Sequence, residues 1–238
     1  MKIIYLYEQV HGFTIATVKE LINLGFEVHI ITRRSNFIIP KIPNLFIYTR
    51  DNLNFFSIHS IIKKINPNLI CVTGWTDKAY LINCAYFKLK KIPIVVHSDN
   101  TWRGTYRNYF ASFLGFFNFF NIFFNFIWIH GPKQQEYVLK IGFKKKQLIY
   151  DHASADLALF HKAFKNNLKI KRKKYPKVFL YVGRLTNSKG INLLLETWGD
   201  IHSKIGWKLK IIGTGPIQIK SNKKKKIIIN NIYSLKNF

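Results

Sequence analysis

The segment YVGRLTNSKG at residues 181–190 places two cations five positions apart at a predicted junction of strand, turn and helix. Its pattern puts Arg184 in the turn, lets Asn187 or Ser188 cap the helix, and puts Lys189 in the first helical turn. A cation there opposes the helix dipole, and a bound anion removes that penalty. A forked guanidinium beside an ammonium suits a diphosphate. The alternative is that both are solvated surface cations of a lysine-rich chain.

The elements that must position these residues follow an alternation of strands and helices. In the first half of the chain, apolar strands such as KIIYLY and EVHIITR are separated by segments with helical spacing such as TIATVKELINLG. Strands that are apolar on both faces and separated by helices indicate a parallel sheet covered on both sides. The sequence therefore predicts an α/β fold with a doubly wound, Rossmann-like domain at residues 1–155.

A change in composition follows this first domain. The segment KAFKNNLKIKRKKYPK is dense in cations and short of apolar residues, so residues 156–176 are predicted to be a basic linker or exposed loop. The alternation restarts at residues 177–238, which predict a second, partial Rossmann-like domain. Its few strands leave apolar faces uncovered. We therefore expect either a second polypeptide that completes this domain or a truncated product.

The chain is strongly basic, with a formal net charge of +27. Phosphate groups, a membrane surface or nucleic acid would each suit this charge. The alternative explanation is an AT-rich coding sequence, which favours Lys, Ile, Asn and Phe whatever the function. No RNA-binding signature of aromatic and basic residues is present, so no nucleic-acid partner is expected.

Cysteine usage and the N-terminus both favour the cytoplasm. Cys71 and Cys84 lie in apolar stretches, which indicates buried thiols in a reducing compartment. The apolar run at the N-terminus is too short for a secretory signal and is predicted to be the first strand. No Asp-x-Asp motif or cluster of His and Cys indicates a metal, so neither a metal nor another cofactor is expected.

One aromatic segment leaves three interpretations open. The run FASFLGFFNFFNIFFNFIWI at residues 110–129 carries no formal charge, and its asparagines recur at helical spacing. It predicts a core helix followed by the strand FIWIHG, or the same helix lying on an anionic membrane with Arg103 and Arg107, or a membrane span. The second interpretation places the protein peripherally on the inner face of the cell membrane.

VFLYVGRLTNSKGINLLLETW resembles the strand, G-R-L, x3, K-G, helix signature of the family 4 (group 1) glycosyltransferases, which have the GT-B fold. The resemblance assigns the diphosphate of a sugar nucleotide to Arg184 and Lys189, next to Gly183. LKIIGTGP, with Gly213 and Gly215, matches the later G-x-G-P loop of the family. The resemblance implies a GT-B architecture, a nucleotide-sugar donor, no metal and retention of anomeric configuration.

The resemblance extends to the N-terminal domain. HSDNTWRGTYRNYF is similar to a stretch that follows a central strand in a subgroup of this family. It implies that His97 and Asp99 contact the acceptor or the donor sugar, and they are the candidate catalytic residues. Trp102 and Arg103 follow as acceptor-side candidates. For His97 the alternative is a satisfied structural group at a strand end.

Two further segments align with family features. The loop EQVHGF lies where GT-B enzymes receive the acceptor, which implies a role for His11 and Gly12. LIYDHASADLALF aligns with the segment between the domains. It keeps Asp156 and Phe160 but has Ala-Ser where the family has Asn-Gly, so the hinge geometry is open.

The sequence lacks one family feature. A Glu-x7-Glu segment contacts the donor sugar and ribose in the family, and this chain has no glutamate after Glu196. The prediction is a glycosyltransferase that moves a sugar from a nucleotide sugar to a cell-envelope or polysaccharide acceptor, either a saccharide or lipid-linked. Whether this chain alone is active stays open. The alternative is a non-catalytic subunit, derived from such an enzyme, that docks on a membrane or a partner.

Overall fold

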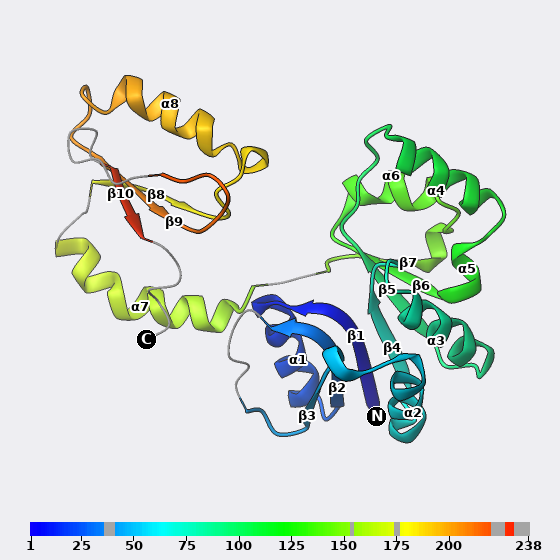
Figure 1. Cartoon of the computed structure of the whole chain (residues 1–238). Coiled ribbons are helices and arrows are strands. Elements are labelled where there is room, and N and C mark those ends of the chain that lie inside the picture. Colours follow the sequence, from blue (N-terminus) through cyan, green and yellow to red (C-terminus); the bar gives the residue numbers. More distant parts are fainter. Residues whose placement is uncertain (36–40, 153–154, 174–176, 220–226, 231–238) are drawn as a thin grey trace. The chain divides into compact units, whose positions relative to one another are not determined.

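A computed structural model describes residues 1–35, 41–152, 155–173, 177–219 and 227–230 of the chain. The chain forms two compact units, Met1–Phe160 and His161–Phe238 (Figure 1). Each unit contains its own parallel sheet. The domain bounds given above stay predictions.

The first unit is built on a seven-stranded sheet in the order β3-β2-β1-β4-β5-β6-β7. Its neighbouring strands pair in parallel. The strands are β1 (Lys2–Val10), β2 (Glu27–Ser35), β3 (Leu45–Thr49), β4 (Leu69–Thr73), β5 (Ile94–Ser98), β6 (Phe126–Ile129) and β7 (Leu148–Ile149). The order reverses between β1 and β4, and such a reversal is where open α/β sheets bind ligands.

Helices cover both faces of this sheet, which confirms the predicted α/β class. The helices are α1 (Gly12–Asn23), α2 (Phe55–Ile65), α3 (Lys78–Leu89), α4 (Tyr106–Phe116), α5 (Phe120–Phe123) and α6 (Pro132–Lys140), with short 3-10 turns at Arg50–Asn52 and Lys145–Gln147. Alternate residues of β1 enter different cores. Ile4 and Leu6 pack with α2 and α3, whereas Ile3 and Tyr5 pack with α1. Cys71 and Cys84 are free and buried, as predicted.

The aromatic segment at residues 110–129 forms two helices and a strand. It contains most of α4, then α5, then β6. Asn118 adopts a left-handed φ of 55°, which ends the helical run because a continuous α-helix cannot accommodate it. The asparagines therefore do not share one helical face, and Asn125 instead accepts a hydrogen bond from the Ile94 N–H at 3.0 Å. In the part of the chain that the structure describes, no helix has the length and apolar character needed to cross a bilayer. Residues 110–129 fold as two short helices and a strand and not as one long helix, so the membrane-span interpretation of this segment is wrong.

The second unit has a three-stranded parallel sheet in the order β10-β9-β8. The strands are β8 (Val178–Val182), β9 (Lys208–Ile212) and β10 (Ile227–Asn230), and α8 (Ile191–Ile201) lies between β8 and β9 in the chain. Ile191 and Trp198 of α8 pack on Leu209 and Ile211 of β9 to form the core. The predicted strand and helix alternation is therefore present.

The predicted basic linker is largely helical. Most of it forms α7 (Leu157–Lys173), a helix of 17 residues. The segment has no glycine or proline before Pro176, and its many lysines have good helix propensity. The high density of cations therefore correctly indicated an exposed segment, but this segment is a helix and not a loop.

Candidate functional site

The two glycine-containing loops of the second unit lie side by side at the carboxyl ends of β8 and β9. The Gly183 N–H donates to the Ile212 carbonyl at 3.0 Å, and the Leu185 N–H donates to the Thr214 carbonyl at 2.9 Å. These bonds continue the pairing of the two strands into the loops. The halves of the predicted diphosphate site are therefore brought together.

Glycine is required where these loops meet. A Cβ added at Gly213 would lie 1.8 Å from the Gly183 carbonyl oxygen, and one added at Gly215 would lie 2.3 Å from the Leu185 carbonyl oxygen. Any side chain at either position would push the two loops apart. The close approach of the two backbones is therefore the physical reason for the G-T-G sequence.

The two predicted diphosphate-binding cations lie on the loop between β8 and α8. The side chains of Arg184 and Lys189 are exposed, and no described residue gives either side chain a hydrogen bond or an ion pair. Both charges are thus available to a ligand. Their role at a diphosphate stays a prediction.

The start of α8 differs from the prediction. Asn187 to Lys189 form a 3-10 turn, and Gly190, with a φ of 69°, is the N-cap of a helix that begins at Ile191. Neither Asn187 nor Ser188 caps α8, and Lys189 precedes the first helical turn. The left-handed conformation of Gly190 explains the difference, because it separates the short turn from the helix.

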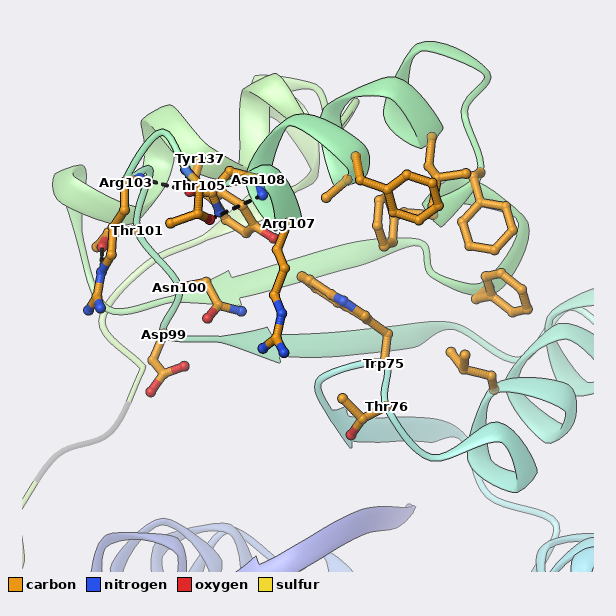
Figure 2. A pocket seen from close by; sticks show the side chains of 17 residues that line it. Trp75, Thr76, Asp99, Asn100, Thr101, Arg103, Thr105, Arg107, Asn108 and Tyr137 are labelled. Atoms are coloured by element: carbon orange, nitrogen blue, oxygen red, sulfur yellow. Dashed lines mark hydrogen bonds between the residues drawn. The ribbon is translucent and has the colours of Figure 1, made fainter.

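In the first unit, a cavity of about 690 Å³ opens beside the loops that follow β4 and β5 and the start of α4. Its size is that of a small-molecule site. Asp99, Asn100 and Arg103 come from the loop after β5, and Trp75 from the loop after β4. Figure 2 shows the Arg107 guanidinium extending from α4 into the space between Asn100 and Trp75.

His97 is enclosed by aromatic rings near the end of β5. It is 5% exposed, and its Nδ1 lies 2.5 Å from the Tyr7 hydroxyl. The rings of Trp128 and His152 lie 5.0 and 4.2 Å away, centroid to centroid. Burial, and then the charges of His152 and His130, lower the pKa of His97 well below its usual value. The imidazole is therefore neutral near pH 7, and its Nδ1 and the Tyr7 hydroxyl share one hydrogen bond.

His97 and Asp99 face different cavities. His97 lines a cavity of about 10 Å³ with Thr14 and His152, and His97 Nε2, Thr14 Oγ1 and His152 Nδ1 are buried without a partner in the described chain. This space fits one water molecule. Asp99 lines the large cavity instead. The structure thus separates the two candidate catalytic residues, whose roles stay predictions.

The residues predicted on the acceptor side also lie in different places, and Arg103 is the one of them that lines the large cavity. His11 and Gly12 are exposed at the end of β1, where the His11 ring stacks on Phe13 at 5.3 Å. Among the described residues they are not part of the large cavity, whereas Arg103 is. Trp102 is not among the residues that line that cavity.

Trp102 has a packing role. Its ring lies 5.3 Å from the Tyr109 ring, and the Lys140 ammonium lies 4.2 Å from its centroid. This side chain packs against the core under α4 and α6. Its aromatic character therefore has a structural explanation.

The sequence interpretation did not place Trp75 or Asn100 at a ligand site, and it assigned Arg107 to membrane contact, whereas all three line the large cavity. The available signal was position, because GWTD directly follows the strand LICVT and so lies at the carboxyl end of β4. Among the described residues, no cluster of His, Cys, Asp or Glu has the composition of a metal site.

A comparison with known protein families supports the general class of glycosyl transferases for the C-terminal part of the chain. Residues 163–237 match the family model described as glycosyl transferases group 1. No protein of curated function matches the chain. The family match therefore lies within the part of the chain that carries the paired glycine loops.

Solved structures share the fold. Anabaena Alr3699/HepE in complex with UDP has a TM-score of 0.63 at 12% identity, covering 97% of this chain and 69% of that one. WaaG, a glycosyltransferase involved in lipopolysaccharide biosynthesis, has a TM-score of 0.55 at 10% identity, covering 96% and 70%. UDP-N-acetylglucosamine 2-epimerase from Rickettsia bellii has a TM-score of 0.57 at 13% identity, covering 97% and 68%. The chain therefore has the α/β fold of GT-B glycosyltransferase structures, and its C-terminal part matches group 1 glycosyl transferases.

Proposed function

We propose that this protein is a retaining, metal-independent glycosyltransferase that moves a sugar from a nucleotide sugar to a cell-envelope or polysaccharide acceptor. An acceptor hydroxyl oxygen bonds to the anomeric carbon of the sugar. The bond from that carbon to the diphosphate breaks, the nucleoside diphosphate leaves, and the hydroxyl proton passes to a base. Cations at the diphosphate stabilise the charge that develops as it leaves.

The observation that carries this proposal is the contact between the two glycine loops of the second unit. The Gly183 and Leu185 backbone bonds to the loop after β9 bring the two matched motifs to one edge of the sheet. Arg184 and Lys189 extend from the same region without a partner of their own among the described residues. Solved neighbours with UDP and with UDP-glucose give the donor class to be tested first.

Asp99 is the better placed of the two candidate catalytic residues. It lines the large cavity, whereas His97 faces a space for one water and has its Nδ1 engaged by Tyr7. We assign the acceptor hydroxyl to Asp99 and a supporting role to His97.

The donor site is tested by calorimetric titration of the full chain with UDP at low salt. Arg184→Ala and Lys189→Ala are each expected to weaken UDP binding about tenfold, because each removes a charge-assisted hydrogen bond. Lys204→Ala removes an exposed lysine elsewhere in the second unit and is the control. Unchanged UDP affinity in both test variants would indicate that Arg184 and Lys189 are solvated surface cations that do not bind the donor.

The epimerase neighbour defines a competing reaction. Nuclear magnetic resonance of UDP-N-acetylglucosamine incubated with the protein and no acceptor separates the two. A transferase leaves the configuration at C2 of the sugar unchanged, and inversion at that carbon would contradict the proposal.

A second candidate, a non-catalytic subunit docking on an anionic membrane, is favoured by the outer face of α4. This face consists of exposed aromatic side chains that do not line the large cavity: Tyr106, Tyr109, Phe113, Phe116 and Phe117. Residues 100–150 contain seven lysines and arginines and one glutamate before Tyr150, so the surroundings are basic. Aromatic and basic residues together suit an anionic lipid surface. Membrane contact through this face is also compatible with the first candidate, the glycosyltransferase.

Flotation with vesicles containing phosphatidylglycerol tests this contact. The double change Arg103→Glu and Arg107→Glu is expected to reduce recovery with vesicles severalfold, since about 1 kcal/mol is associated with each basic residue near the surface. Lys63→Glu with Lys64→Glu makes the same change in net charge on α2 and is the matched control. Equal recovery for both double variants would remove the membrane proposal.

A further inference from the structure

The cavity of about 690 Å³ in the first unit has both polar and apolar lining residues, and along α4 the lining changes from Arg107 in the first turn to Phe110 and Leu114 in later turns. The polar lining residues include Thr76, Asp99, Asn100, Thr101 and Arg107. The apolar lining residues include Leu81, Phe110, Leu114, Phe119, Phe120 and Phe123. A ligand that contacts both sets must itself have a polar part and an apolar part.

Among the described residues, no direct partner neutralises the charge of Arg107. Within the described chain, the Arg107 guanidinium has no hydrogen bond and no ion pair, although Asp99 lines the same cavity. Figure 2 shows Arg107 pointing into the cavity, with the side chains of Asp99 and Asn100 on the opposite loop. A guanidinium fork suits a phosphate, whereas a carboxylate and an amide suit hydroxyl groups.

The apolar lining continues toward solvent along α4. Phe120 is buried, but Phe110 at the rim is 65% exposed. The outer aromatic face of α4, which includes Phe116, begins on the same helix. A hydrocarbon chain in the cavity would thus leave it beside the aromatic face of α4 for which membrane contact is the second candidate above.

We propose that this cavity binds an amphiphile whose head carries a phosphate and hydroxyl groups and whose tail is a hydrocarbon chain. The phosphate lies at Arg107, a hydroxyl lies at Asp99, and the chain lies on the phenylalanines. This inference rests on the proposed function, in which the amphiphile is the acceptor. It narrows the acceptor class to lipid-linked molecules and excludes a free saccharide.

Equilibrium binding to the full chain tests the inference with dodecyl phosphate, octyl phosphate, dodecanol and inorganic phosphate, each below the concentration at which it aggregates. Dodecyl phosphate is expected to bind at least tenfold more tightly than any of the others. The reason is that each buried CH₂ contributes about fourfold to affinity and the phosphate needs the guanidinium. Inorganic phosphate that binds as tightly as dodecyl phosphate would overturn the proposal in favour of a simple anion site.

Different variants test the contact with the phosphate head and the contact with the hydrocarbon tail separately. Arg107→Gln is expected to weaken dodecyl phosphate binding at least tenfold and leave dodecanol binding unchanged. Phe110→Ser is expected to weaken both, whereas Phe116→Ser, on the outer face of the same helix, should weaken neither. Both phenylalanines are exposed, so neither change threatens folding. Equal binding of dodecyl phosphate to wild type and Arg107→Gln would contradict the assignment.

The donor site provides the cross-control. Arg184→Gln is expected to weaken UDP binding and to leave dodecyl phosphate binding unchanged, with the reverse for Arg107→Gln. If UDP fails to bind while dodecyl phosphate behaves as expected, the transferase proposal fails and the amphiphile site stands. If UDP binds and dodecyl phosphate does not, only the amphiphile site is overturned.

Discussion

Gly213 shows how the absence of one side chain determines the shape of the candidate donor site. The carbonyl of Gly183 occupies the place where a Cβ of residue 213 would be. The sequence motif predicted that Gly213 belongs to the donor site. The contact that requires glycine there involves Gly183, which lies thirty positions earlier in the chain. A functional motif and a packing constraint therefore coincide at one residue.

Gly213→Ala is expected to lower the free energy of unfolding by about 1–3 kcal/mol, because the added methyl group forces backbone apart. It should also weaken UDP binding. The matched control is Gly199→Ala within α8, where an added Cβ meets no atom within 4 Å. That change should raise stability by about 0.5–1 kcal/mol, as for alanine in a helix interior. Urea unfolding measures both, and similar effects of the two changes would contradict the close-contact argument.

At the scale of elements, α3 is held at its N-terminus by one carboxylate. Asp77 is the N-cap and accepts hydrogen bonds from the N–H groups of Ala79 and Tyr80 at 2.9 and 3.2 Å. Arg33 and Arg50 approach the same carboxylate at 3.0 and 3.1 Å. Burial raises the pKa of Asp77, but the Tyr80 N–H and the two arginines outweigh it and leave the pKa below its usual value. This arrangement fixes the loop that carries Trp75 and Thr76 into the large cavity.

Asp77→Ala is expected to cost about 2–4 kcal/mol of stability, since it removes a cap and leaves the largely buried Arg50 without its charge partner. Asp77→Asn keeps the capping oxygen and should cost less. Asp51→Ala changes an exposed carboxylate in the neighbouring 3-10 turn and should stay within about 0.5 kcal/mol of wild type. Urea unfolding ranks the three variants, and a loss for Asp77→Ala no larger than that for Asp51→Ala would contradict this role.

At the scale of the whole molecule, the dependence of stability on pH follows from where the titrating groups are buried. His97 faces Tyr5, Tyr7, Trp128 and His152, and its pKa is well below its usual value. Burial, followed by the charge of His130, lowers the pKa of His152 to about 4, with Asp99 opposing the shift. The unfolded chain therefore binds protons more readily than the folded one below pH 6.5.

Stability is expected to fall as the pH drops from 7 to 5, by at most about 1.4 kcal/mol per pH unit for each of these histidines. The lowered pKa values of Glu27 and Asp77 affect stability in a separate, more acidic pH range. Their stabilisation is lost only as the pH falls below their unfolded values of 4.5 and 3.8. Urea unfolding at pH 7 and pH 5 should show a smaller difference for His152→Phe than for wild type. His161→Gln removes an exposed histidine as the control, and an undiminished difference in His152→Phe would contradict this source of the pH dependence.

The sequence by itself determined the order and type of the strands in both sheets and of most helices, with α7 as the exception, because the period of apolar residues is a local property that strands and helices satisfy wherever they pack. It also placed Arg184, Asp99 and the glycine loops at strand ends, where parallel sheets expose ligand sites. Tertiary structure alone decided that His97 is enclosed while Asp99 is open to a cavity, and that Arg107 extends into that cavity. It also decided that Gly213 meets Gly183. Each of these depends on contacts between segments far apart in the chain, and no local pattern encodes which distant backbone or ring will occupy the neighbouring space.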